Sequence, residues 1–271
     1  MIKKTNTNRI EQTFIELKKK NKKALIPFIT AGYPDYDSFI NLFFTLQNAG
    51  ADIIEIGMPF SDPIADGQII QQSSKVSLEK GFNTALLISS IKQIRQIQIR
   101  QKLQTPIAVM TYFNIVYKYG VGKFLEELVD AGADGIIIPD LPFEEFLKYK
   151  NIFINSGLSN IMLATLSTDK PRLKQILEYC SGFLYFVLLK GVTGSKGEIQ
   201  RKTIDMLLSI KEQTELPVSV GFGISEPAQV ELIKNYCDGI IIGSKIISLI
   251  NKDDSNFVQI VEFIKKIKNK L

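Results

Sequence analysis

Eight short apolar segments alternate with helical segments along this chain, and this alternation limits the possible folds more than any other feature. The apolar segments are too short for most helices and carry few polar residues on either face, which is typical of strands in a parallel sheet covered by helices. Eight such units in 271 residues favour a closed barrel over an open sheet or two smaller domains. The predicted strands are Ala24 to Thr30, Ile53 to Ile56, Pro106 to Met110, Gly135 to Pro139, Ile161 to Thr165, Phe183 to Leu188, Pro217 to Val220 and Gly239 to Ile242.

The predicted fold class is therefore α/β, a single (β/α)8 TIM barrel with an extra N-terminal helix. Ile10, Phe14 and Leu17 recur at helical spacing, so residues 1–23 are expected to form a helical extension that plugs one end of the barrel. No proline- or serine-rich linker follows, so residues 24–271 are expected to form the barrel itself, within one domain spanning 1–271. Residues 111–119 are predicted as a loop, and helices are predicted at 36–49, 71–91, up to 101, 121–131, 143–152, 170–180, 199–213, 227–236 and from Ser244 onward.

Two carboxylates lie near the end of the second predicted strand. Glu55 interrupts an isoleucine run, where an unpaired charge would be costly, and Asp66 follows in a loop rich in Gly, Pro and Ser. Taken singly, Glu55 can be half of a buried ion pair and Asp66-Gly67 an ordinary turn. Because barrel enzymes place their chemistry at the carboxyl ends of strands, we expect both side chains to face one mouth. A buried acid beside a better solvated one is an arrangement used for acid–base catalysis.

The composition removes several classes of function. The chain has no histidine, which excludes histidine-based catalysis and histidine-ligated metals, and its two cysteines, Cys180 and Cys237, lie outside any metal or redox motif. No metal site is therefore expected. The net charge of +5 comes largely from lysine runs near both ends without interleaved aromatic residues, so nucleic-acid binding is not expected. The sequence shows no membrane span and no secretion signal, which predicts a cytoplasmic protein, or one of the plastid stroma if the gene is organellar.

Glycine-rich turns follow the last two predicted strands, and a third lies between residues 191 and 197. Gly221 and Gly223 come after the seventh strand, and Gly243-Ser244 opens a helical turn after the eighth. Backbone N–H groups in such turns can hold a phosphate, although tight packing explains them too. Lys245 would add positive charge if it turned inward. The 191–197 loop is either a lid with glycine hinges or an ordinary surface loop.

The chain resembles the tryptophan synthase alpha subunit family. The stretches that carry the resemblance occur in the family's order and cover nearly the whole chain. They are LIPFITAGYPD (25–35), IEIGMPFSDPIADG (54–67), MTYFN (110–114), IIIPDLP (136–142), GVTG (191–194), VGFGIS (220–225) and DGIIIGS (238–244).

The resemblance implies a lyase that cleaves indole-3-glycerol phosphate, a phosphate ester, to indole and glyceraldehyde 3-phosphate by a retro-aldol reaction. No cofactor is implied on this chain. Indole would pass to a beta subunit carrying pyridoxal phosphate, in an α2β2 tetramer that makes L-tryptophan. Glu55 matches the family's acid–base residue, and Asp66 matches the residue that accepts from the indole N–H. The implied substrate contacts are Phe28 and Tyr185 for the indole pocket, Thr193 for the lid, and Gly194, Gly223, Gly243 and Ser244 for the phosphate.

The chain departs from the family pattern at Gln68, at Leu188, Leu189 and Lys190, and at Lys245. These positions bear on the loop that holds Asp66, on lid closure and on coupling to the beta subunit, and they leave both carboxylates in place. Two alternative functions therefore stay open. The chain could be an activating partner without turnover of its own, or another phosphate-binding barrel enzyme such as an indole-glycerol-phosphate synthase or an isomerase.

Overall fold

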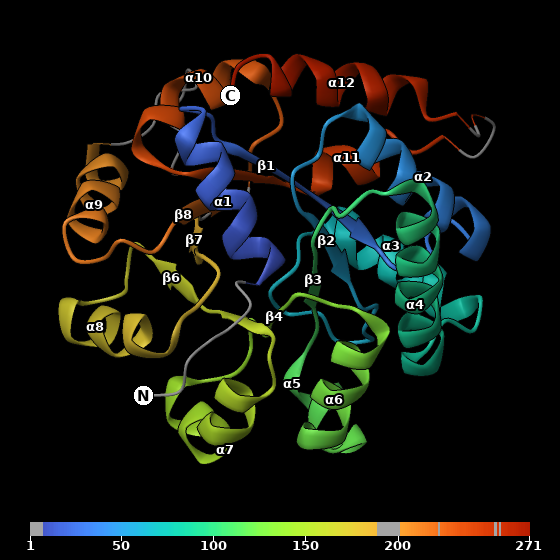
Figure 1. Ribbon diagram of the computed structural model, residues 1–271, viewed down its shortest axis with the longest axis horizontal. Coiled ribbons are helices and arrows are strands. Elements are labelled where there is room, and N and C mark those ends of the chain that lie inside the picture. Colours follow the sequence, from blue (N-terminus) through green and yellow to red (C-terminus); the bar gives the residue numbers. More distant parts are fainter. Residues whose placement is uncertain (1–7, 189–200, 222, 252–253, 255) are drawn as a thin grey trace.

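A cylinder of parallel strands surrounded by helices forms the molecule (Figure 1). The computed structural model describes residues 8–188, 201–221, 223–251, 254 and 256–271. Within these ranges one sheet of nine strands has the order β5-β4-β3-β2-β1-β9-β8-β7-β6, and every pairing is parallel. The strands are β1 (Ala24–Thr30), β2 (Ile54–Gly57), β3 (Ile107–Met110), β4 (Gly135–Ile137), β5 (Ser159–Ile161), β6 (Leu163–Thr165), β7 (Leu184–Val187), β8 (Val218–Gly221) and β9 (Gly239–Ile242).

The ninth strand arises because the predicted strand at 161–165 is interrupted at Met162. The part before Met162, β5, pairs with β4, and the part after it, β6, pairs with β7. One continuous run of chain therefore joins the two ends of the sheet order. This run completes the (β/α)8 TIM barrel, and the predicted fold class is confirmed.

Helices follow the strands around the outside of the barrel, except for α1, which precedes the first strand. They are α1 (Arg9–Lys19), α2 (Tyr36–Ala49), α3 (Gln68–Glu79), α4 (Thr84–Gln101), α5 (Phe113–Tyr119), α6 (Val121–Ala131), α7 (Phe143–Asn155), α8 (Lys170–Tyr179), α9 (Arg201–Lys211), α10 (Pro227–Ile233), α11 (Ser244–Ser248) and α12 (Val258–Lys268), with a 3-10 turn η1 (Lys234–Tyr236). None of the helices in the described ranges is long and apolar enough to cross a bilayer.

Two predictions about helices were wrong. The stretch 111–119 was predicted as a loop, but it contains α5, whose first backbone N–H, at Phe113, donates to the Asp140 carboxylate at 2.8 Å. The helical region predicted at 71–91 breaks after Glu79, because Gly81 adopts a left-handed conformation with φ of 82°. The first helix after β2 therefore ends at Glu79, and α4 begins separately at Thr84. The first helix begins at Gln68, two residues after Asp66.

Side chains alternate between two apolar layers along each strand. In β1, Leu25 and Ile29 face the helices, whereas Ile26 and Phe28 belong to a second cluster inside the barrel. Both clusters consist of fully or almost fully buried residues. Because successive strand residues point to opposite faces, membership in one cluster or the other shows which way each side chain points.

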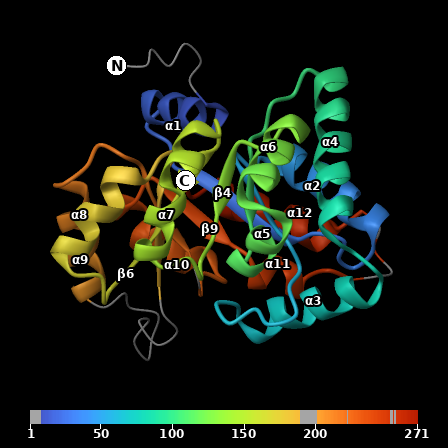
Figure 2. The ribbon, with the colours of Figure 1, turned by 90° about the horizontal axis from the view of Figure 1, so that it is seen from below.

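The N-terminal helix closes one end of the barrel, as predicted. Ile10, Phe14 and Leu17 of α1 are buried and belong to the interior cluster, and the ring centroids of Phe14 and Phe183 are 5.7 Å apart. Arg9 anchors the helix by donating to Asp134, with Nε 2.5 Å from Oδ1. Figure 2 shows α1 at one end of the barrel and α3 at the opposite end. The carboxyl ends of the strands therefore form the mouth that α1 does not cover.

Candidate active site

Glu55 points into the barrel from β2. Ile54 and Ile56 pack in the outer cluster, whereas Ile53, two residues before Glu55 and on the same face, packs in the interior cluster. The Glu55 side chain is fully buried, and neither of its carboxylate oxygens has a hydrogen-bond partner among the described residues. The reading of Glu55 as half of a buried ion pair is therefore wrong for the described part of the chain.

Asp66 reaches the same region from the loop between β2 and α3. The loop turns through a hydrogen bond from the Asp66 N–H to the Pro63 carbonyl at 3.0 Å, and Gln71 of α3 donates its side-chain amide to the Asp66 carbonyl at 2.9 Å. Asp66 is thus part of a turn, as the alternative interpretation of the Asp66-Gly67 pair predicts. Its carboxylate nevertheless faces inward and is buried. One oxygen, Oδ2, accepts from the Tyr112 hydroxyl at 2.9 Å, and Oδ1 has no partner among the described residues.

The two carboxylates differ in how strongly their surroundings oppose ionisation. Burial, together with the nearby charge of Asp66, raises the pKa of Glu55 from 4.5 to about 8. Burial also raises the pKa of Asp66, but the hydrogen bond from Tyr112 opposes this effect, and the pKa is about 6. At neutral pH, Glu55 therefore holds a proton and Asp66 is mostly ionised. One side chain can donate a proton where the other can stabilise positive charge.

Tyr112 is a site residue whose role no local pattern predicted. Its hydroxyl donates to Asp66 and accepts the Ala65 N–H at 3.2 Å, so it holds both the carboxylate and the loop that carries it. Phe60, from the same loop, stacks on the Tyr112 ring at a centroid distance of 4.9 Å. The stretch MTYFN contains Tyr112 and contributed to the family resemblance. However, the hydrogen-bond partner of Tyr112 lies 46 positions away in sequence, which is beyond the reach of any local signal.

Phe28 and Tyr185, the two predicted aromatic contacts, lie inside the barrel near the carboxylates. Phe28 is the register partner of Glu55 on the neighbouring strand. A Cβ on Gly57 would lie 2.4 Å from Phe28 Cζ, so only glycine leaves room for that ring. Tyr185 is almost fully buried, and burial together with the charges of Glu55 and Asp66 raises the pKa of its hydroxyl. The two acids and Tyr185 thus lie within electrostatic reach of one another.

The predicted phosphate-binding residues lie at neighbouring strand ends. β8 and β9 are adjacent in the sheet, Gly223 follows the first, and Gly243 and Ser244 follow the second. Gly223 has φ of 80°, and apart from its chain neighbours no atom of the described residues lies within 4 Å of the place where its Cβ would be. Gly243 packs closely on Phe28, since a Cβ on this glycine would lie 3.1 Å from Phe28 Cδ1. Thr193 and Gly194 lie outside the described residues, as does the whole 191–197 loop.

The positions that depart from the family pattern lie at different places in the structure. Gln68 is exposed and is the first residue of α3. Leu188 is buried at the end of β7, where its N–H donates to the Gly221 carbonyl at 2.9 Å. Lys245 is half-buried in α11. Leu189 and Lys190 lie outside the described residues.

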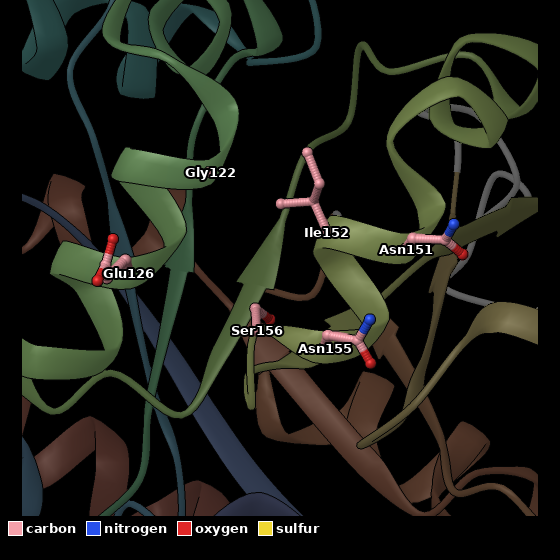
Figure 3. Close-up of a pocket in the computed structure, with 6 residues that line it drawn as sticks. All are labelled: Gly122, Glu126, Asn151, Ile152, Asn155 and Ser156. Carbon is pink, nitrogen blue, oxygen red and sulfur yellow. The ribbon is translucent and has the colours of Figure 1, made fainter.

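A hollow on the outer surface is separate from this site. It has a volume of about 420 Å³ and lies between α6 and α7, on the outside of the barrel (Figure 3). It is lined by Gly122, Glu126, Asn151, Ile152, Asn155 and Ser156. Among the residues described by the structure, no three histidine, cysteine, aspartate or glutamate side chains gather closely enough to hold a metal ion.

The fold and the site define a class of protein: a TIM barrel with two buried carboxylates of different pKa, Glu55 and Asp66, within electrostatic reach of each other. The family model for the tryptophan synthase alpha chain matches residues 14–270. The chain therefore belongs to the tryptophan synthase alpha chain family. This membership decides against the alternative of an indole-glycerol-phosphate synthase or an isomerase.

Individual relatives agree with the family assignment. The tryptophan synthase alpha chain of Geotalea daltonii is 41% identical over 239 residues, which cover 88% of this chain and 89% of the relative. That of Caldanaerobacter subterraneus subsp. tengcongensis is 44% identical over 247 residues, covering 90% and 91%. Among solved structures, the alpha subunit from Legionella pneumophila superposes with a TM-score of 0.89 at 31% identity and 98% coverage of both chains.

Proposed function

We propose that this chain is a carbon–carbon lyase that cleaves indole-3-glycerol phosphate to indole and glyceraldehyde 3-phosphate. The observation that carries the proposal is the pair of buried acids with different pKa values, about 8 for Glu55 and about 6 for Asp66. A retro-aldol cleavage of this substrate needs a proton donor at one carbon of the indole ring. It also needs an anion near the ring nitrogen, where positive charge develops.

The protonated Glu55 is suited to the first task. It would donate its proton to C3 of the indole ring, to which the glycerol chain is attached. Once ionised, it would accept the proton of the hydroxyl group next to the breaking bond, as that carbon becomes the aldehyde of glyceraldehyde 3-phosphate. Glu55 gives one proton and receives one, so it ends the reaction in its starting state, and no external acid or base is consumed.

The ionised Asp66 is suited to the second task. Its Oδ1 has no hydrogen-bond partner among the described residues, so it can accept from the indole N–H while Tyr112 holds Oδ2. An anion beside the ring nitrogen stabilises the protonated ring more than the neutral substrate, which lowers the barrier. Phe28 and Tyr185 would border the indole. The phosphate would be held by Gly194, Gly223, Gly243 and Ser244, and Thr193 of the closing loop would contact Asp66.

We further propose that indole passes to a pyridoxal-phosphate-dependent beta subunit in an α2β2 tetramer for L-tryptophan synthesis, without a cofactor on this chain. Family membership supports this part of the proposal. A single domain over 1–271 and a cytoplasmic location stay predictions.

One assay tests the proposal. The purified chain is mixed with indole-3-glycerol phosphate, and indole is measured with and without a beta subunit. Indole release that Glu55→Gln abolishes, with ligand binding retained, is the expected result. An activating partner without turnover would form no indole in either case, and unchanged turnover of Glu55→Gln would overturn the role of that residue.

A further inference from the structure

A cavity of about 330 Å³ lies between α7, α8 and the interruption that separates β5 from β6. This volume falls within the range of about 300–1,000 Å³ that is usual for small-molecule pockets. Most of its lining is apolar, and three of the lining residues are phenylalanines of one helix. The residues used in the argument are Phe143, Phe146 and Phe153 of α7, Ile176 of α8, and Ile161 and Leu163 of the strands.

The cavity follows from the way in which the barrel closes. Because β5 pairs with β4 and β6 pairs with β7, the strand run is interrupted at Met162 between two differently paired halves. Ile161 belongs to the interior cluster, and Leu163 packs against that cluster, yet both also line the cavity. The cavity therefore extends from the helix layer to the side chains inside the barrel. It is separate from the two carboxylates.

Arg172 supplies a polar group at this apolar cavity. One nitrogen of its guanidinium, Nη2, donates to Glu144, and the guanidinium carbon lies 5.3 Å from the centroid of the Phe143 ring. The other terminal nitrogen, Nη1, is buried and has no hydrogen-bond partner among the described residues. A buried donor without an acceptor costs free energy, and among the described residues that line the cavity Arg172 is the one with a cationic side chain.

We propose that this cavity binds a small aromatic carboxylate. The phenylalanine rings would pack on the aromatic ring of the ligand, and Arg172 would hold its carboxylate, since a guanidinium can donate two parallel hydrogen bonds to that group. Glu144 does not prevent this, because two-thirds of its side chain is exposed, so it can exchange the guanidinium for water at little cost. The proposal does not depend on the reaction proposed above.

The chain contains no tryptophan, which allows a local optical test. Phe143→Trp places a single tryptophan beside Arg172, and phenylacetate is then titrated while the emission is recorded. The proposal predicts a saturable change in emission. Adding Arg172→Gln should weaken phenylacetate binding at least tenfold, and 2-phenylethanol, which lacks the charge, should bind correspondingly more weakly than phenylacetate.

A second readout uses the chain without the added tryptophan, in case Phe143→Trp disturbs the fold. Saturation-transfer NMR on phenylacetate is compared between the unmodified chain, Arg172→Gln and Lys174→Gln. Lys174 is exposed on the same helix, so its replacement makes the same change in charge outside the cavity. Loss of the signal in Arg172→Gln alone supports the site. Equal signals in all three proteins, equal loss in both variants, or no saturable binding in either experiment would overturn it.

Discussion

Replacing Glu55 by glutamine is expected to change how the stability of the fold depends on pH. Burial and the charge of Asp66 raise the pKa of Glu55 from 4.5 to about 8. Between these two values the folded chain holds a proton that the unfolded chain has released. The folded state then binds more protons than the unfolded state, so the Glu55 contribution to stability falls as pH rises through this window. Glutamine does not titrate, so the Glu55→Gln variant lacks this loss of stability as the pH rises.

The size of the effect follows from the shift in pKa. Each pH unit inside the window changes the free energy of unfolding by about 1.4 kcal/mol. From about pH 5 to pH 8, the stability of the variant should therefore increase by about 3.5 kcal/mol relative to the unmodified chain, which is less than three full steps because Glu55 begins to ionise in the folded chain near pH 8. The buried amide has its own cost. That cost does not depend on pH, so it cancels when the difference between the two proteins is compared across pH.

Urea unfolding of both proteins at several pH values measures this difference, provided that the two m-values agree. Glu212→Gln is the matched control, because Glu212 is exposed and its replacement should leave the difference flat. A flat difference for Glu55→Gln as well would mean that Glu55 is ionised in the folded protein at neutral pH. That result would refute its assignment as a proton donor.

Three further predictions concern the surroundings of Glu55. Tyr112→Phe removes the hydrogen bond that lowers the pKa of Asp66, so that pKa should rise. The acidic limb of the pH profile of indole formation should then move to higher pH, and an unchanged limb would contradict this role for Tyr112. Asp66→Asn should abolish indole formation and lower the pKa of Glu55. The pH range over which Glu55 affects the free energy of unfolding would then become narrower. An unchanged range would show that the two groups do not interact. Gly221→Ala should destabilise the fold by about 1–3 kcal/mol in thermal or urea unfolding, because its Cβ would lie 2.5 Å from the Tyr185 hydroxyl; full stability would mean that this ring moves freely.

Sequence analysis predicted correctly the positions at which the local pattern alone shows that any other placement of the side chain would cost free energy. A single acid in a strand of isoleucines must face either solvent or a special environment, and the apolar neighbours of Glu55 exclude solvent. The apolar spacing of Ile10, Phe14 and Leu17 likewise leaves one face of α1 that must be covered, and the barrel end covers it. Both features could therefore be predicted before any tertiary contact was known.

The features that were missed depend on partners far away in sequence. α5 is short and rich in aromatic and β-branched residues, which are weak helix formers, and its first N–H is satisfied by Asp140, 27 positions away. The interruption at Met162 lies inside an unbroken apolar run, and its cause is that the two halves pair with different strands. The contact between Tyr112 and Asp66 joins residues 46 positions apart, so no local pattern predicts it either.

The helix α1 makes the two ends of the barrel different, because it closes one of them. Among the described residues, Ile10, Phe14 and Leu17 fill the end opposite the mouth, so a small product of the proposed reaction would leave Glu55 toward the carboxyl ends of the strands. A partner seated over those ends would receive the product before it mixed with bulk solvent. The N-terminal segment would thus determine where the product goes, although it contributes no group to the chemistry.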